Sequence, residues 1–211
     1  MNELIPIFPL ELVVYPGEAL NLHIFEPRYR QLIHDCITAK LPFGIPSVIN
    51  GQVARLDTLV KLVEISHTHP DGKLDIRTQG LKIFHLRRVI KQLPGKLYGG
   101  AFVDYPQNHS ASDPARRRKM LASVKKLHQL MRVKKTFGVS PARLQSYHVA
   151  HHVGLDREQE FALLSLLHER DRLQFLQAHL DRLLPLVAGL EALKEKIRLN
   201  GHFKVLPGLK L

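Results

Sequence analysis

The stretch ALNLHIFEPRYRQLIHDC, residues 19–36, decides how the first half of the chain folds. Leu20, Leu22 and Ile24 alternate with residues of the opposite face, which predicts a β-strand with one side on a hydrophobic core. Pro27 suits the first position of a helix, because that position leaves its backbone N–H unpaired in any case. The apolar residues of this helix recur at spacings of three and four, at Tyr29, Leu32, Ile33 and Cys36.

The Glu-Pro-Arg step at residues 26–28 lies between two apolar runs and is predicted to turn the strand into the helix. Glu26 is expected beside the positive end of the helix dipole, where a carboxylate is favoured by about 0.3 to 1 kcal/mol. Arg28 and Arg30 are expected to pair with Glu26 or with another loop. This charged step therefore needs no catalytic explanation.

Residues 1–106 carry the signals of short strands and turns. The β-rich runs 57–65 and 73–79 flank the turn sequence HTHPDG, residues 67–72, which predicts a hairpin. Further strands, each bounded by Gly, Pro or Asn, are predicted at residues 5–8, 21–25, 43–49, 81–89 and 97–104. Many short strands without helices between them favour a small, partly closed β-barrel.

After the polar segment 104–114, the apolar period changes from that of strands to that of helices. A first helix with a basic outer face is predicted from an apolar stripe at Met120, Leu121, Val124, Leu127 and Met131. A second is predicted from Ser140 as N-cap and Pro141 as first residue to Gly154 as terminator. A third begins at Asp156, which lies three residues before a glutamine as in a capping box.

The last helical pattern is the longest, with an apolar seam over residues 173–197. Such a seam needs a partner helix, either from the same bundle or from a second chain. Pro185 is expected to bend or break the helix because it removes a backbone donor, and Asn200 and Gly201 are expected to end it. Because Lys194 interrupts the seam, both self-association through this helix and an ordinary intramolecular bundle stay open.

The composition excludes several classes of function. The chain has 211 residues, of which 45% are hydrophobic, enough for a buried core. Its single cysteine, Cys36, excludes an intrachain disulfide and a cysteine-rich zinc site and favours a reducing cytoplasm. No apolar run approaches the roughly 18 residues of a membrane span, and no export signal is recognised. No phosphate-binding loop, serine elbow or zinc-protease helix occurs, and Cys36 lacks a convincing catalytic partner.

The net charge of +12 is concentrated in one segment. Residues 114–155 contain no Asp or Glu but ten of the 31 Lys and Arg residues, which leaves 21 bases against 19 acids elsewhere. The rest of the chain is therefore almost neutral, and the first predicted helix has a strongly basic outside.

The run IPIFPLELVVYPGEALNLHIFEPRYRQLI, residues 5–33, resembles the opening of the N-terminal domain of Lon protease. Its FPL, YPG and LHIFEPRY elements form an ordered set that is typical of that family. The resemblance continues through FGI (43–45), TLVKL (58–62), DGKLDIRTQGLKIF (71–84) and YGGAFV (98–103). It extends more loosely through the helical half and so covers nearly the whole chain.

This resemblance implies an α+β fold, with a PUA-like β pseudo-barrel over residues 1–106 followed by an α-helical bundle over residues 115–211. It also implies a non-catalytic module that binds unfolded or extended protein segments without a cofactor or metal, since the ATPase and Ser-Lys protease parts of Lon are not recognised here. The family usually has Gly-Thr before its central strand, so Asp57 and Thr58 predict a different turn. The family-motif positions, expected to be architectural, are Phe8, Pro9, Pro16, Gly17, Phe25, Glu26, Pro27, Arg28 and Tyr29.

Nucleic-acid binding is the main alternative, because RNA-binding proteins also use PUA-like folds. The basic helix over residues 116–135 would contact a phosphate backbone. Its candidate polyanion patch consists of Arg116, Arg117, Arg118, Lys119, Lys125 and Lys126. Between Arg116 and Lys135 there is no Phe, Tyr or Trp side chain for base stacking, so this patch predicts only weak nucleic-acid binding.

A metal centre is the third hypothesis. His148, His151 and His152 in YHVAHHV lie at helical spacing, but the surrounding sequence offers no carboxylate to complete a site. Ordinary histidines on a partly exposed helix are the favoured interpretation. His67 and His69 in the hairpin turn carry still less weight, so no metal ligand is predicted.

Overall fold

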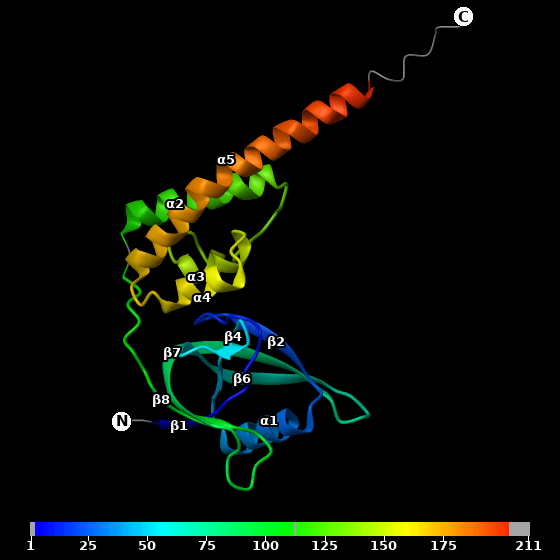
Figure 1. The fold of residues 1–211 in the computed structure, drawn as a ribbon, viewed down its shortest axis with the longest axis vertical. Coiled ribbons are helices and arrows are strands. Elements are labelled where there is room, and N and C mark those ends of the chain that lie inside the picture. The colour runs from blue at the N-terminus through cyan, green and yellow to red at the C-terminus, as the bar shows by residue number, and fades with distance from the viewer. Residues whose placement is uncertain (1–2, 112, 203–211) are drawn as a thin grey trace, which may run out of the picture.

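The computed structural model describes residues 3–111 and 113–202. A β pseudo-barrel occupies the first half of the chain and a helical subdomain the second (Figure 1). Helix α1 (Pro27–Ala39) lies at one end of the barrel and the helical subdomain at the other. The predicted α+β fold is confirmed.

The barrel is built from one antiparallel sheet whose strand order is β1-β8-β7-β6-β3, with β2 also paired to β7. Backbone hydrogen bonds from Phe8 N–H to Gly44 O (2.8 Å) and from Leu10 N–H to Pro46 O (3.0 Å) join the two ends of this sheet and close the barrel. A separate hairpin is formed by β4 (Val48–Ile49) and β5 (Gln52–Val53). The strands of the main sheet are β1 (Glu3–Pro6), β2 (Ala19–Ile24), β3 (Phe43–Ile45), β6 (Leu56–Thr68), β7 (Leu74–Ile90) and β8 (Gly100–Asp104).

The long strand β7 replaces the two strands predicted on either side of Gly80, which was interpreted as a boundary. A side chain at Gly80 would place its Cβ 2.2 Å from the Tyr15 carbonyl oxygen. Gly80 N–H donates to Glu18 O (2.8 Å), and Gly17 N–H donates to Gly80 O (3.0 Å). Glycine is therefore needed here so that the turn at residues 15–18 can lie directly on the sheet.

Other strand boundaries also differ from the prediction. The strand expected at residues 43–49 is divided into β3 and β4, because Pro46 has no N–H for the ladder and its carbonyl accepts from Leu10 instead. Strand β8 begins at Gly100 and not at Leu97, whose N–H donates to the Gln31 side chain (2.7 Å). The predicted hairpin turn is confirmed, with His69 N–H donating to Lys73 O (2.9 Å).

Asp57 and Thr58 do not form a turn but lie buried inside β6. The Asp57 carboxylate accepts from Ser47 N–H (2.8 Å), and the Thr58 hydroxyl donates to Val14 O. Burial raises the pKa of Asp57 to about 7, although the Ser47 hydrogen bonds act in the opposite direction. These two side chains tie β6 to neighbouring segments of the barrel wall.

The opening stretch folds as predicted. Pro27 begins α1, and the Arg28 guanidinium donates to the Glu26 carboxylate (2.8 Å). Arg30 donates instead to Asp71 O in the hairpin turn (3.3 Å), so each arginine uses one of the two expected partners. The buried face of α1 consists of Tyr29, Leu32, Ile33 and Cys36.

The helical subdomain contains α2 (Pro114–Leu130), α3 (Ser146–Val149), a 3₁₀ turn at Ala150–His152, α4 (Arg157–Ser165) and α5 (Glu169–His202). The capping box is confirmed, since Gln159 N–H donates to Asp156 (2.8 Å) and Asp156 N–H to Gln159 (3.1 Å). The predicted helix start at Ser140 and Pro141 is wrong. Those residues form a local turn, with Arg143 N–H donating to Ser140 O (2.9 Å), and α3 begins only at Ser146. Met131 also lies beyond the end of α2 and is exposed, not part of its buried stripe.

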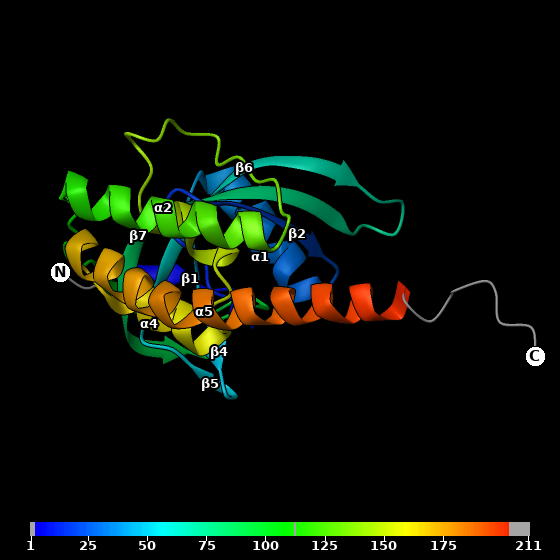
Figure 2. The ribbon, with the colours of Figure 1, turned by 90° about the horizontal axis from the view of Figure 1, so that it is seen from above.

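Helix α5 is continuous past Pro185, so the break offered as one outcome there does not occur. The helix also includes Asn200 and Gly201, which were expected to end it, because glycine weakens a helix by only about 1 kcal/mol without blocking its hydrogen bonds. Residues Leu173, Leu176 and Leu180 are fully buried in the bundle. Figure 2 shows that the second half of α5 extends beyond α2.

One hydrophobic core crosses the boundary between barrel and bundle. Val13, Tyr15, Leu56 and Ile83 of the barrel pack in the same cluster as the buried faces of α2 to α5. A second cluster lies between the barrel and α1, and a third lies along β1 and β8. Among the described helices, none is both long and apolar enough to cross a lipid bilayer.

Candidate functional site

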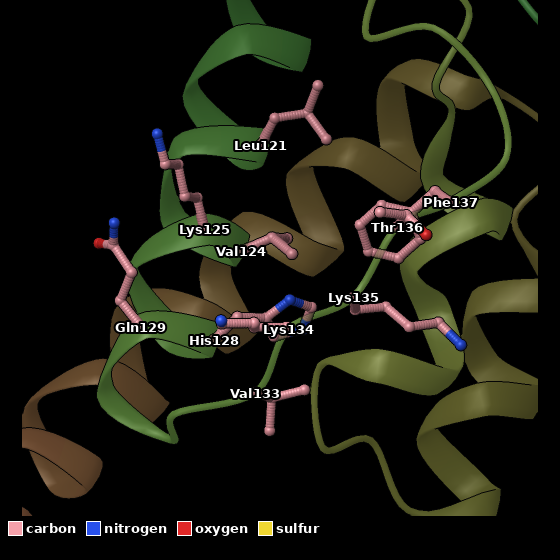
Figure 3. A pocket seen from close by; sticks show the side chains of 10 residues that line it. All are labelled: Leu121, Val124, Lys125, His128, Gln129, Val133, Lys134, Lys135, Thr136 and Phe137. Atoms are coloured by element: carbon pink, nitrogen blue, oxygen red, sulfur yellow. The ribbon is translucent and has the colours of Figure 1, made fainter.

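A hollow on the helical subdomain that combines apolar and basic side chains lies between α2 and the segment that follows it. This pocket has a volume of about 500 Å³. Figure 3 shows Leu121, Val124 and His128 of α2 on one side and Phe137 on the other. Phe137 stands between His128 and His152, with ring centroids 6.1 and 5.7 Å away. These rings hold the segment beside α2 while leaving the hollow open.

A second, strongly apolar pocket of about 360 Å³ adjoins the first, since His128, Val133 and Lys135 line both. It is completed by Leu127 and Met131 and by Leu183 and Val187 of α5. Val133 and Met131 are 47% and 55% exposed, so both present apolar surface to solvent. We call these two pockets together the groove.

The groove leads toward the barrel through a third pocket of about 420 Å³, which shares Lys135, His151 and His152 with the second. The barrel contributes the turn at residues 16–19 to its lining. The three pockets therefore lie next to one another between α2 and the border between the two halves of the molecule.

The groove is basic. Lys125, Lys134 and Lys135 line the first pocket, and its ten lining residues, all within the described chain, include no acid. This follows from the sequence, because residues 114–155 contain no Asp or Glu. An apolar hollow with ammonium groups at its rim favours a ligand that is partly apolar and partly anionic.

His151 joins the barrel to the bundle beside the groove. Its Nδ1 lies 2.6 Å from the Glu160 carboxylate of α4, and its Nε2 lies 3.1 Å from the Glu18 carboxylate of the barrel. Burial disfavours the imidazolium, but the hydrogen bonds to Glu160 and Glu18 outweigh it and raise the pKa of His151 to about 9. His151 is therefore a charged bridge between the two halves at neutral pH.

The other members of the predicted histidine group have separate roles. His148 Nδ1 accepts from Gln145 N–H at the start of α3 (3.1 Å), and the His152 carbonyl accepts from His128 (2.8 Å). The segment is a short α-helix followed by a 3₁₀ turn, so the expected α-helical spacing does not hold. All three histidines line the third pocket, but, among the described residues, their nitrogen atoms are not part of a group of possible metal ligands.

Cys36 lies on the buried face of α1, between this helix and the barrel. Burial raises the pKa of its thiol to about 12, so it stays protonated at neutral pH. A buried thiol of this kind packs as a small hydrophobic side chain.

The six bases of the predicted polyanion patch lie along α2. Lys125 lines the groove, whereas Arg116 and Lys119 line a separate pocket against α5. Arg116 also forms an ion pair with Asp113 (3.7 Å). Arg118 and Lys126 are exposed, and Arg117 is half-buried.

Most of the family-motif positions surround α1 and not the groove. Phe8 stacks on Tyr29 with ring centroids 3.8 Å apart, and the Arg28 guanidinium lies over the Tyr29 ring at 4.5 Å from its centroid. Pro9 is half-buried next to Phe8, and Phe25 is 58% exposed. Among these positions, only Pro16 and Gly17 line the third pocket, which lies between the groove and the barrel. Gly17 has a φ of +84°, which explains why glycine is required in this turn.

Sequence reasoning missed the apolar lining of the groove. Met131 was assigned to a buried stripe, and Val133 and Phe137 were not assigned at all. Their signal is the run MRVKKTFGV, residues 131–139, in which apolar residues are separated by bases without helical or strand period. Such a segment cannot bury both classes of side chain and leaves apolar groups at the surface.

A buried polar network was also missed. Arg172 and Glu169 are 1% and 0% exposed and form an ion pair of 2.9 Å. Arg172 also donates to Asn108 (2.8 Å) in the segment that leaves the barrel, and Glu169 accepts from Ser146 at the start of α3. The network fixes α5, α3 and the connecting segment to one another.

Comparison with known proteins agrees with this architecture. No curated protein matches the chain. A Lon N-terminal domain protein from Xanthomonas campestris is similar in its crystal structure, with a TM-score of 0.65 and 24% identity over 83% of this chain and 98% of that one. The N-terminal domain of a Mycobacterium avium complex Lon protease has a TM-score of 0.62 and 13% identity over 85% of this chain and 98% of that one. The model of the ATP-dependent protease La (Lon) substrate-binding domain matches residues 4–182, and the chain belongs to this family.

Proposed function

We propose that this substrate-binding domain recognises protein substrates by holding an extended segment in the groove. The observation that carries the proposal is the pair of adjoining pockets with exposed apolar lining, which includes Val133 and Met131. An extended chain presents side chains at intervals that two neighbouring pockets can receive in turn. The family match supports a role in substrate binding.

The charge of the groove indicates which segments it prefers. Three lysines and no acid line the first pocket, so acidic residues next to apolar ones would improve binding. Basic segments would be repelled. The nucleic-acid alternative gains no support from the family match or from the similar structures, and the bases of α2 face more than one pocket.

We further propose that the domain is not itself an enzyme and acts in cytoplasmic proteolysis by presenting substrates. The protonated, buried state of Cys36, which is not among the groove-lining residues, supports a purely binding role. Hydrolysis of a bound peptide by the pure chain would contradict this part of the proposal.

The test uses fluorescence anisotropy with an unstructured, dye-labelled peptide in which leucine and phenylalanine alternate with glutamate. Val133→Asp should weaken binding by about tenfold or more, because a buried valine contact is worth roughly 1.5 to 3 kcal/mol. Lys134→Glu should weaken it too, with an effect that shrinks as salt is added.

Matched controls lie on the barrel. Leu97→Asp changes a side chain that is 56% exposed, and Lys61→Glu changes an exposed lysine of β6. Neither should alter the peptide affinity. Equal losses in the groove and barrel variants, or no binding by the unaltered chain, would overturn the proposal.

A further inference from the structure

A second group of polar side chains lies on the barrel, and none of its members lines the groove. Asp75 of β7 is paired with His23 of β2 on one side and with His67 of β6 on the other. Directly opposed residues on neighbouring strands project from the same face of a sheet. The register therefore places an imidazole on each side of one carboxylate.

The position of His67 depends on an irregularity in the sheet. The pairing of β6 with β7 shifts between Ile65 and His67, where a bulge adds one residue to β6. In a regular ladder, Ser66 would follow Ile65 and oppose Asp75. The bulge brings His67 to that place instead.

The hairpin turn supplies a third imidazole. His69 Nε2 lies 2.8 Å from one oxygen of Asp75, and His23 Nδ1 lies 2.6 Å from the other. The His67 and His69 ring centroids are 4.5 Å apart, and those of His23 and His69 are 5.4 Å apart. Ligating atoms of His23, His69 and Asp75 all lie within 4.8 Å of one another, an arrangement found at one place in the part of the chain that the structure describes.

We propose that His23, His69 and Asp75 bind a divalent transition-metal ion, with His67 as a further ligand. Zinc fits the donor set best, because it accepts imidazole nitrogen and carboxylate oxygen in tetrahedral geometry. Adjacent ligand atoms around tetrahedral zinc lie about 3.4 Å apart, given bonds of about 2.0 to 2.2 Å. Calcium and magnesium are poor candidates, since they prefer oxygen ligands throughout.

The cluster has the room and access that the ion needs. The side chains of His23, His69 and Asp75 are 50%, 34% and 38% exposed, so small rotations bring their ligating atoms to bonding distances. A pocket of about 520 Å³ beside His23 and Asp75 is lined by polar groups including Glu64 and Ser66. Solvent or a further ligand can reach an open coordination position from this pocket.

A bound ion would connect three segments of the barrel. His23 comes from β2, His67 and His69 come from the end of β6 and the following turn, and Asp75 comes from β7. Figure 1 shows this β6–β7 hairpin projecting from the body of the barrel. Because the ion binds the folded arrangement of these segments, it stabilises the native state by an amount that grows with the logarithm of its concentration once that concentration exceeds the Kd.

The test is titration of zinc chloride into protein made without a histidine tag, followed by calorimetry. One ion per chain should bind, and cobalt(II) in its place should give the absorption bands of a tetrahedral site. His23→Ala and His69→Ala should each weaken zinc binding by about tenfold or more. Both residues are at the surface, and thermal unfolding without metal should match that of the unaltered chain.

The matched control is the double variant His148→Ala with His152→Ala, which changes two histidines of the other histidine-rich segment. It should bind zinc as the unaltered chain does. The proposal is overturned if zinc fails to saturate the protein at about 1 mM, or if the control loses binding while the His23 and His69 variants keep it.

Discussion

At the scale of single residues, His151 links the two halves of the molecule by charge. It contacts Glu18 of the barrel and Glu160 of α4, and Tyr15 adds a hydrogen bond to the Glu160 backbone (3.0 Å). The folded pKa of His151 is about 9, whereas an unfolded histidine titrates near 6.5. Between these values the native state binds more protons than the unfolded state, so stability falls as the pH rises.

We therefore predict that the stabilisation of the native state by protonated His151 is complete below about pH 6.5 and is lost as the pH passes 9. Urea unfolding measures the free energy of unfolding at pH 6 and at pH 9.5. The decrease between these two pH values should be smaller in His151→Gln than in the unaltered chain. His34→Gln, at an exposed histidine of α1, serves as the control. An identical pH dependence in all three proteins would show that His151 is not coupled to folding.

The Arg172 network gives a second prediction at this scale. Arg172→Met removes one partner of a fully buried ion pair and leaves Glu169 charged and unpaired, which should cost about 3 to 5 kcal/mol. Urea unfolding followed by circular dichroism measures the change. Arg170→Met alters a neighbouring side chain that is 69% exposed and should cost less than about 1 kcal/mol. Similar values for the two variants would contradict the assigned role.

Two pairs of residues that are close in sequence were predictable, whereas contacts between residues distant in sequence were not. Glu26 with Arg28 and Asp156 with Gln159 are local pairs that the spacing alone indicates. His151 meets Glu18 across 133 positions, so no sequence spacing reveals the contact. The same limit applies to the cluster at Asp75, because only the sheet register and a bulge bring its histidines together.

At the scale of elements, local signals predicted α1 and α4 well, because Pro27 and an apolar stripe mark α1 and a capping box begins α4. The predicted element boundaries were wrong where tertiary contacts, and not local signals, determine the structure. Gly80 resembles a strand boundary, but the turn at residues 15–18 requires glycine within the strand. Ser140 and Pro141 resemble a helix start, yet they form a local turn that follows the groove-lining residues 133–137.

Helix α5 serves two purposes along its length. In its first half, the apolar residues Leu173, Leu176 and Leu180 are buried within the bundle. In its second half, four apolar side chains are 54% to 66% exposed: Leu186, Leu190, Leu193 and Ile197. Their spacings of four, three and four match the seam of a helix pair. Part of the apolar seam therefore packs within the same chain, as one of the two alternatives predicted, and the rest of it is exposed.

We predict that this uncovered part mediates association between copies of the chain. Sedimentation velocity should detect dimers that increase with concentration, and Leu190→Lys should shift the population to monomer. Ala192→Lys, two residues further and about 200° around the helix, should leave it unchanged. A chain that stays monomeric at the highest concentration measured would refute self-association through α5.

At the scale of the whole molecule, the barrel and the bundle act as one scaffold because a single hydrophobic cluster crosses their border. The fold class and the family could be predicted from ordered motifs in the first 33 residues and from the change of period after residue 114. The division into units at residues 1–106 and 115–211 stays a prediction. The groove could not be located, because its lining comes from separate segments that only the folded chain brings together.

The central claim is that an extended substrate segment binds in the groove. Titrating the alternating peptide into ¹⁵N-labelled protein and following amide shifts tests it most directly. The largest shifts should cluster within residues 121–137 and around Leu183 and Val187, which line the two pockets. Shifts confined to the barrel, around α1 or the outer face of β2 and β7, would contradict it.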